Sequence, residues 1–137
     1  MLDFKKELSM YNLDEKNSVV IGSGLLNSLG IRESEDIDAV LEEETFDNLK
    51  KNATLIEKEN QYGAQLLTNG VVEFSNRWYI DFLGIDLSFE DLIRQSTVID
   101  GVRYVDLELL LEIKKLWARE KDLRDVELIE NYLERNR

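Results

Sequence analysis

The spacing of apolar residues along the chain predicts short strands that alternate with helices. In residues 2–11 the apolar side chains recur at roughly helical intervals, which predicts a short packing helix. Ser18–Ile21 is a mainly apolar run typical of a buried strand. Gly24–Leu29 follows as a short helical turn, which Gly30 closes because glycine suits the end of a helix.

The next segment alternates between two faces, as a strand does. Residues 36–41 place Asp36 and Asp38 on one face, because side chains two positions apart point the same way. Thr45 is then expected to cap a helix that continues through Lys50.

Two β-hairpins are predicted from their turns. Ala64–Leu67 and Val71–Phe74 flank an Asn-Gly pair at positions 69–70, and Asn-Gly between apolar runs is the strongest short hairpin signal. Thr97–Val105 predicts a second hairpin, which turns at the Asp-Gly pair of positions 100–101.

Helices dominate the C-terminal part of the chain. Ser88 is expected to cap a helix that runs to Gln95, whereas the strongly apolar segment Trp78–Leu87 is assigned no element. Residues 106–119 and Leu123–Arg135 both show apolar spacing of 3.6 residues and predict a C-terminal helical pair. The order of elements predicts an α+β (mixed α/β) fold, a mixed β-sheet backed by helices, in one domain spanning residues 1–137.

Composition restricts the chemistry that this fold can carry. The 137 residues include no Cys and no His, so we expect any bound metal to have oxygen ligands, as Mg²⁺ or Mn²⁺ prefers. The formal net charge of −12 argues against an extended nucleic-acid surface, because phosphates attract basic surfaces. No apolar run approaches the length of a membrane span, and the N-terminal sequence lacks the apolar core of a signal peptide. We therefore expect a cytoplasmic protein that does not enter a membrane.

Two short patterns near the N-terminal end are candidates for phosphate and metal binding. Gly22 and Ser23 end the first predicted strand, where backbone amides and a hydroxyl can approach phosphates. Asp36 and Asp38 place two carboxylates on one strand face, where they could hold Mg²⁺. Taken separately, the first pattern also fits a tight turn and the second the start of an exposed strand.

Together these patterns resemble the motif of the nucleotidyltransferase superfamily with the DNA polymerase β-like fold. That motif is an apolar residue, then Gly and Gly or Ser, then about a dozen residues, then D-x-D or D-x-E between apolar residues. Here it is matched by Ile21, Gly22, Ser23, Asp36 and Asp38. The resemblance implies a nucleotidyltransferase-like sheet, divalent metals held by the two aspartates, and a triphosphate seated on the Gly-Ser turn.

The C-terminal segment resembles small stand-alone members of that superfamily, including relatives of toxin–antitoxin nucleotidyltransferases. These carry a helix with Lys, then R-x-K-D-x-x-D before the last helix, matched here by Lys114, Arg119, Lys121, Asp122 and Asp125. The cations are of a kind that reaches a triphosphate, and ion pairs with the two aspartates could hold them in place. We expect Lys114 and Arg119 to bind phosphate and the aspartates to be structural. The other interpretation is an ordinary helix junction with surface salt bridges.

Active members of the superfamily usually add a third carboxylate on a neighbouring strand. Glu73 and Asp81 both lie between apolar residues, and we choose Glu73 because small relatives carry an acidic residue there. The resemblance implies that Glu73 completes the metal site and activates the acceptor.

Aromatic residues and one arginine receive simpler interpretations. Trp78, Tyr79 and Phe82 are expected to fill the core or a subunit contact, and Trp117 to pack within its helix. Arg32 could either clamp a substrate phosphate or pair with an acidic neighbour in sequence.

We therefore expect a minimal nucleotidyltransferase that transfers a nucleoside monophosphate from a nucleoside triphosphate, with ATP the expected donor, to an acceptor hydroxyl. The sequence names neither the acceptor nor the base, and a homodimer or a protein partner is expected to supply the acceptor surface. The alternative function is a non-catalytic nucleotidyltransferase-like partner, such as the antitoxin-type half of a toxin–antitoxin pair. The strong acidity fits that alternative, since an acidic surface could cover a basic partner.

Overall fold

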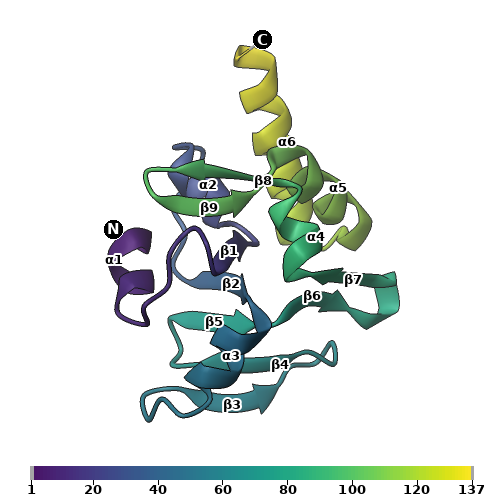
Figure 1. Ribbon diagram of the computed structural model, residues 1–137. Helices are drawn as coiled ribbons and strands as arrows, with labels where there is room; N and C mark the ends of the chain where they lie inside the picture. The colour runs from purple at the N-terminus through teal and green to yellow at the C-terminus, as the bar shows by residue number, and fades with distance from the viewer. Residues whose placement is uncertain (1, 137) are drawn as a thin grey trace.

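Seven strands form a mixed sheet in the computed structural model, which describes residues 2–136. Their order across the sheet is β3-β4-β5-β2-β1-β9-β8, and β6 and β7 form a separate two-stranded sheet (Figure 1). The strands of the large sheet are β1 (Ser18–Ile21), β2 (Ile37–Leu41), β3 (Ile56–Glu59), β4 (Gln65–Thr68), β5 (Val72–Ser75), β8 (Ser96–Ile99) and β9 (Val102–Val105). The strands of the small sheet are β6 (Arg77–Ile80) and β7 (Ile85–Ser88).

Helices connect and flank the strands. They are α1 (Phe4–Ser9), α2 (Gly24–Ser28), α3 (Glu43–Leu49), α4 (Phe89–Ile93), α5 (Leu107–Trp117) and α6 (Glu120–Arg135), with a 3-10 turn at Asp81–Leu83. Figure 1 shows α4, α5 and α6 gathered at one end of the molecule, with the C-terminal part of α6 extending away from it. Across residues 2–136, no helix is both long and apolar enough to cross a bilayer.

The three central strands determine which side chains meet. β2 pairs antiparallel with β1 and parallel with β5. In this register Asp38 lies opposite Ile21 on one side and opposite Glu73 on the other. Residues widely separated in sequence therefore meet because adjacent strands lie only about 4.8 Å apart.

A continuous apolar core supports these strands. The side chains of β1 are all buried, as are four of the five in β2. Phe4 of α1, Leu26 of α2 and Ile129 of α6 belong to the same cluster. The N-terminal and C-terminal helices are thus held on one core, which fixes the α5–α6 junction relative to the sheet.

The α+β class, the mixed sheet and the C-terminal helical pair are confirmed, while two helix starts were predicted wrongly. Thr45 does not cap α3, since the helix already begins at Glu43 and the Thr45 hydroxyl donates to Glu42 at 3.1 Å. Helix α6 begins at Glu120 rather than Leu123, because the Asp122 carboxylate accepts the backbone N–H of Arg119 at 3.2 Å and so caps the helix start. Acidic residues beside each helix start made these boundaries hard to find.

The apolar segment that was assigned no element forms the hairpin β6–β7. Its strands are separated by a 3-10 turn that ends at Gly84, whose φ of +67° favours glycine. Trp78 is buried, as predicted, whereas Phe82 on the turn is 63% exposed and does not fill the core; for Phe82 the subunit contact stays a prediction. Strand β3 was not predicted because all four of its side chains are exposed and carry little apolar alternation.

Candidate functional site

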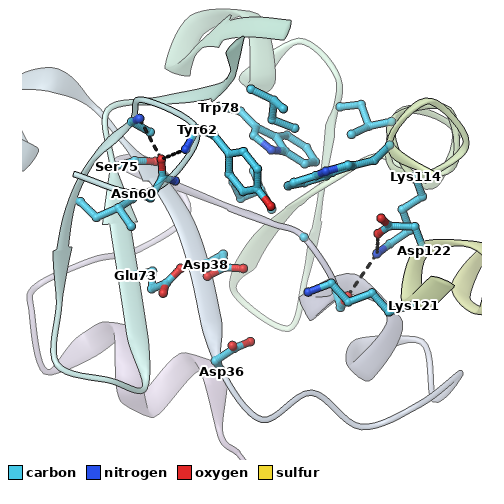
Figure 2. A pocket seen from close by; sticks show the side chains of 18 of the residues that line it. Asp36, Asp38, Asn60, Tyr62, Glu73, Ser75, Trp78, Lys114, Lys121 and Asp122 are labelled. Atoms are coloured by element: carbon cyan, nitrogen blue, oxygen red, sulfur yellow. Dashed lines mark hydrogen bonds and ion pairs between the residues drawn. The ribbon is translucent and has the colours of Figure 1, made fainter. Parts of the chain in front are cut away.

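A cavity of about 820 Å³ lies between the central strands and the α5–α6 junction. Its walls come from the end of β1, from β2, β5 and β6, from the loop between β3 and β4, and from α5 and α6. Figure 2 shows acidic side chains on the strands on one side and Lys114, Lys121 and Asp122 on the other. The cavity size falls within the range of small-molecule sites.

The acidic side consists of Asp36, Asp38 and Glu73. The pairing of β2 with β5 places Asp38 directly beside Glu73. Asp36 precedes β2, is exposed, and points to the same side of the strand, although Figure 2 shows it apart from the other two. Asp81, the other candidate third carboxylate, does not line this cavity and instead accepts the backbone N–H of Phe82 at 2.7 Å.

Asp38 is electrostatically strained. Its Oδ1 atom is shielded from solvent and has no hydrogen-bond partner among the described residues. Burial, followed by the negative charges of Asp36 and Glu73, raises the pKa of Asp38 to about 8, while Lys121 opposes the shift. The site would thus gain free energy from any cation that neutralises this group of carboxylates.

Gly22 brings the end of β1 close to Asp38. Its φ is +70°, and a Cβ at this position would lie 3.0 Å from Asp38 Oδ2. Glycine is therefore required here both for its backbone conformation and for the space it leaves to the carboxylate.

The cationic side is built on two buried aspartates at the start of α6. Lys114 Nζ lies 2.9 Å from Asp125 Oδ2 and 3.7 Å from Asp122 Oδ1, and all three side chains are buried. The alternative interpretation, an ordinary helix junction with surface salt bridges, does not describe the Lys114 pairs, since they are shielded from solvent. A buried lysine needs such partners because an unpaired buried charge is strongly unfavourable.

Arg32 joins the Gly-Ser turn to the same aspartates. Its Nε and Nη2 donate to the two carboxylate oxygens of Asp125 at 2.7 and 2.8 Å. Nη2 also donates to Ser23 Oγ at 2.7 Å, and Lys114 Nζ lies 3.3 Å from the same oxygen. Burial opposes ionisation of Asp125, but the hydrogen bonds from Arg32 and Lys114 outweigh it and lower its pKa to about 2.

Arg119 and Lys121 complete this side. Arg119 Nε donates to Asp122 Oδ2 at 2.6 Å, and its guanidinium lies 3.5 Å from the centre of the Trp117 ring. Lys121 is exposed, and within residues 2–136 it forms no ion pair. Its charge acts on Asp38 across the cavity, so Lys121 is the more available of the two cations.

Asp38 and Glu73 are the residues whose chemistry could suit a magnesium ion. In residues 2–136, no three Asp or Glu side chains are arranged as a complete metal site. Mg²⁺ usually takes one or two protein carboxylates together with substrate phosphates and water. The neighbouring Asp38 and Glu73, with the unpartnered Oδ1 atom, supply such a pair of oxygen ligands.

The structure brings Gly22, Ser23, Asp38, Glu73 and Lys114 around one cavity, as the sequence led us to expect. Arg32, for which the sequence left two interpretations open, also lines the cavity. Its partner is Asp125 rather than an acidic neighbour in sequence, and only the tertiary fold brings these two residues together. The structure also adds Tyr62, which no motif marked because it lies in an irregular loop.

Comparisons with protein-family models, with curated proteins and with solved structures found no match to this chain. The likeness to nucleotidyltransferases therefore remains a prediction, based on its motifs and on the arrangement of the cavity.

Proposed function

We propose that this protein binds a magnesium–nucleoside triphosphate and transfers the nucleoside monophosphate to an acceptor hydroxyl. ATP is the expected donor. Asp36, Asp38 and Glu73 would hold the metal, and Gly22 and Ser23 would seat the triphosphate beside Lys114 and Arg119.

The observation that carries this proposal is the separation of charge across the cavity. One side presents the carboxylates of Asp36, Asp38 and Glu73. Across the cavity lies the ion-paired cluster of Arg32, Lys114, Arg119, Asp122 and Asp125, together with Lys121. Four cations against two carboxylates leave this cluster with an excess of two positive charges, which suits a polyphosphate, while the carboxylates of Asp36, Asp38 and Glu73 suit its metal. The remaining charged residues of the lining are Glu33, Glu35, Lys58, Glu59 and Arg77.

The proposed reaction is a displacement at the α-phosphorus. The acceptor oxygen forms a bond to this phosphorus, the bond to the bridging oxygen of the β-phosphate breaks, and pyrophosphate leaves. Glu73, as a carboxylate beside Asp38, takes the proton of the acceptor hydroxyl. Lys121 and Arg119 balance charge on the leaving pyrophosphate. A metal held by Asp36, Asp38 and Glu73 would supply further charge neutralisation.

Two measurements test the proposal. Calorimetry with ATP and Mg²⁺ should show binding that requires the metal and is lost in Asp38→Asn. Asp86→Asn is the matched control, because Asp86 is exposed and does not line the cavity.

Radiolabel from α-labelled ATP, but not from γ-labelled ATP, should then enter a component of a cell lysate. Transfer of the γ-label would indicate a kinase instead, and unchanged transfer by Asp38→Asn would exclude this site.

One observation favours the non-catalytic alternative. The Ser23 hydroxyl already contacts Arg32, Lys114 and Asp125, so these groups hold one another in the absence of a ligand. Absence of metal-dependent binding of any nucleoside triphosphate would support a partner protein, and copurification with a basic protein would then be expected.

A further inference from the structure

Two aromatic side chains line the same cavity as the charged residues. Tyr62 comes from the loop between β3 and β4, and Trp117 from the last turn of α5. Their rings meet edge to face, with centres 5.0 Å apart. Figure 2 shows Tyr62 extending into the cavity above Asp38 and Glu73. We call Tyr62 and Trp117 the aromatic wall.

Core packing does not fully account for the aromatic wall. Trp78 is buried at 7% exposure, whereas Tyr62 and Trp117 are only partly buried. The other aromatic ring beside Tyr62 is that of Phe82, with ring centres 5.9 Å apart, and Phe82 is itself 63% exposed. A partly open aromatic surface on a polar cavity is typical of a binding site rather than of a core.

Hydrogen bonds within the chain hold the loop that carries Tyr62 in place. Asn60 Oδ1 accepts the backbone N–H groups of Tyr62 and Ala64, both at 2.9 Å. Gln61 Nε2 donates to the Tyr62 hydroxyl at 2.6 Å. Preorganisation of this kind lowers the entropy lost on binding and favours a planar ligand of defined position.

We infer that the aromatic wall is the nucleobase subsite of this cavity. The inference rests on the proposed function and adds the part of the nucleotide that the charged residues leave unaddressed. Arg119 links the two parts, because its guanidinium lies on the Trp117 ring and also donates to Asp122 of the cationic side. Stacking does not depend on the hydrogen-bonding groups of the base, so we expect ATP and GTP to bind alike. Purine rings stack more strongly than the smaller pyrimidine rings, so we expect purine nucleotides to bind several-fold more tightly than pyrimidine nucleotides.

The test compares a nucleotide with its phosphate chain alone. Magnesium–ATP should bind at least about tenfold more tightly than magnesium–tripolyphosphate, which has no base. In Trp78→Phe, where Trp117 is the remaining tryptophan, ATP should quench the fluorescence and tripolyphosphate should not.

Matched variants separate the base from the phosphates. Tyr62→Leu should weaken ATP binding about tenfold or more and leave tripolyphosphate binding unchanged, which also shows that the variant is folded. Trp117→Leu should weaken ATP binding by at least as much, and because the Trp117 ring supports Arg119 it should also weaken tripolyphosphate binding. Tyr62→Phe keeps the ring and should bind ATP as the wild type does. Tyr132→Leu, on α6 and outside the cavity, is the control.

Equal affinity for ATP and tripolyphosphate, with Asp38→Asn abolishing both, would overturn the nucleobase subsite and leave the proposed function intact. Absence of metal-dependent ATP binding to the wild type would overturn both.

Discussion

Asp38 is the residue at which the stability of the fold and the proposed function oppose each other. Its carboxylate lies beside Glu73 and near Asp36, with one oxygen lacking a partner. Lys114 is the opposite case, because its buried charge is compensated by Asp125 and Asp122. Removing the charge from these two residues should therefore change stability in opposite directions.

Replacing Asp38 by Asn should stabilise the protein without metal. The pKa of Asp38 in the folded state, about 8, lies above the ordinary value of 3.8 for an aspartate, so this group weakens the fold progressively as pH rises from about 4 to about 8. At pH 7.5 we expect Asp38→Asn to raise the free energy of unfolding by about 1–3 kcal/mol, with little gain near pH 4. Urea denaturation at both pH values measures this. A loss of stability at pH 7.5 would contradict the strain assigned to Asp38.

Magnesium should stabilise the wild type but not Asp38→Asn. Millimolar Mg²⁺ at pH 8 should raise the melting temperature of the wild type, because a cation relieves the carboxylate repulsion. The same addition should leave Asp38→Asn unchanged. An equal response of both proteins would place the metal elsewhere.

Replacing Lys114 by Met should destabilise the fold strongly. The change leaves Asp122 and Asp125 buried with fewer positive partners, and we expect a loss of about 3–5 kcal/mol. Lys115→Met is the matched control, since Lys115 is exposed on the same helix and should change stability by less than about 0.5 kcal/mol. Chemical denaturation compares the two, and similar losses would show that the Lys114 pairs contribute little.

At the scale of elements, α2 is held close to the sheet by a glycine. A Cβ at Gly24 would lie 2.4 Å from Val20 of β1 and 2.7 Å from Phe4 of α1. The close approach positions the Gly-Ser turn above Asp38, so the geometry of the candidate site depends on this packing.

Gly24→Ala should therefore lower the free energy of unfolding by about 1–3 kcal/mol, despite the higher helix propensity of alanine. Phe4→Leu should relieve part of the overlap, so the double variant should lose less than the sum of the two single losses. Strictly additive losses in a double-mutant cycle would show that the two positions do not interact.

At the scale of the whole molecule, charge is the dominant property. The net charge of −12 makes the folded chain repel itself, and salt screens this repulsion. The excess of cations beside the Gly-Ser turn is a local exception that the overall charge conceals.

Raising NaCl from about 50 to 500 mM at pH 7.5 should raise the melting temperature by a few degrees, because the Debye length falls well below the protein radius. At pH 4.5, close to the sequence pI, the salt effect should largely disappear. Differential scanning calorimetry at both pH values checks this, and the same salt response at pH 4.5 would exclude overall repulsion as its cause.

The sequence by itself determined the fold class, most of the elements, and the motif in which a Gly-Ser turn is followed by two aspartates. These features depend on local periodicity and turn chemistry, which are written in neighbouring residues. Only the tertiary structure decided that Glu73 rather than Asp81 lies beside Asp38, because strand register is set by pairing between distant segments. It also decided that Arg32 binds Asp125 and that Tyr62 meets Trp117, contacts joining positions 93 and 55 residues apart. The cavity exists because the core holds α5 and α6 against the sheet, and no local pattern encodes that distance.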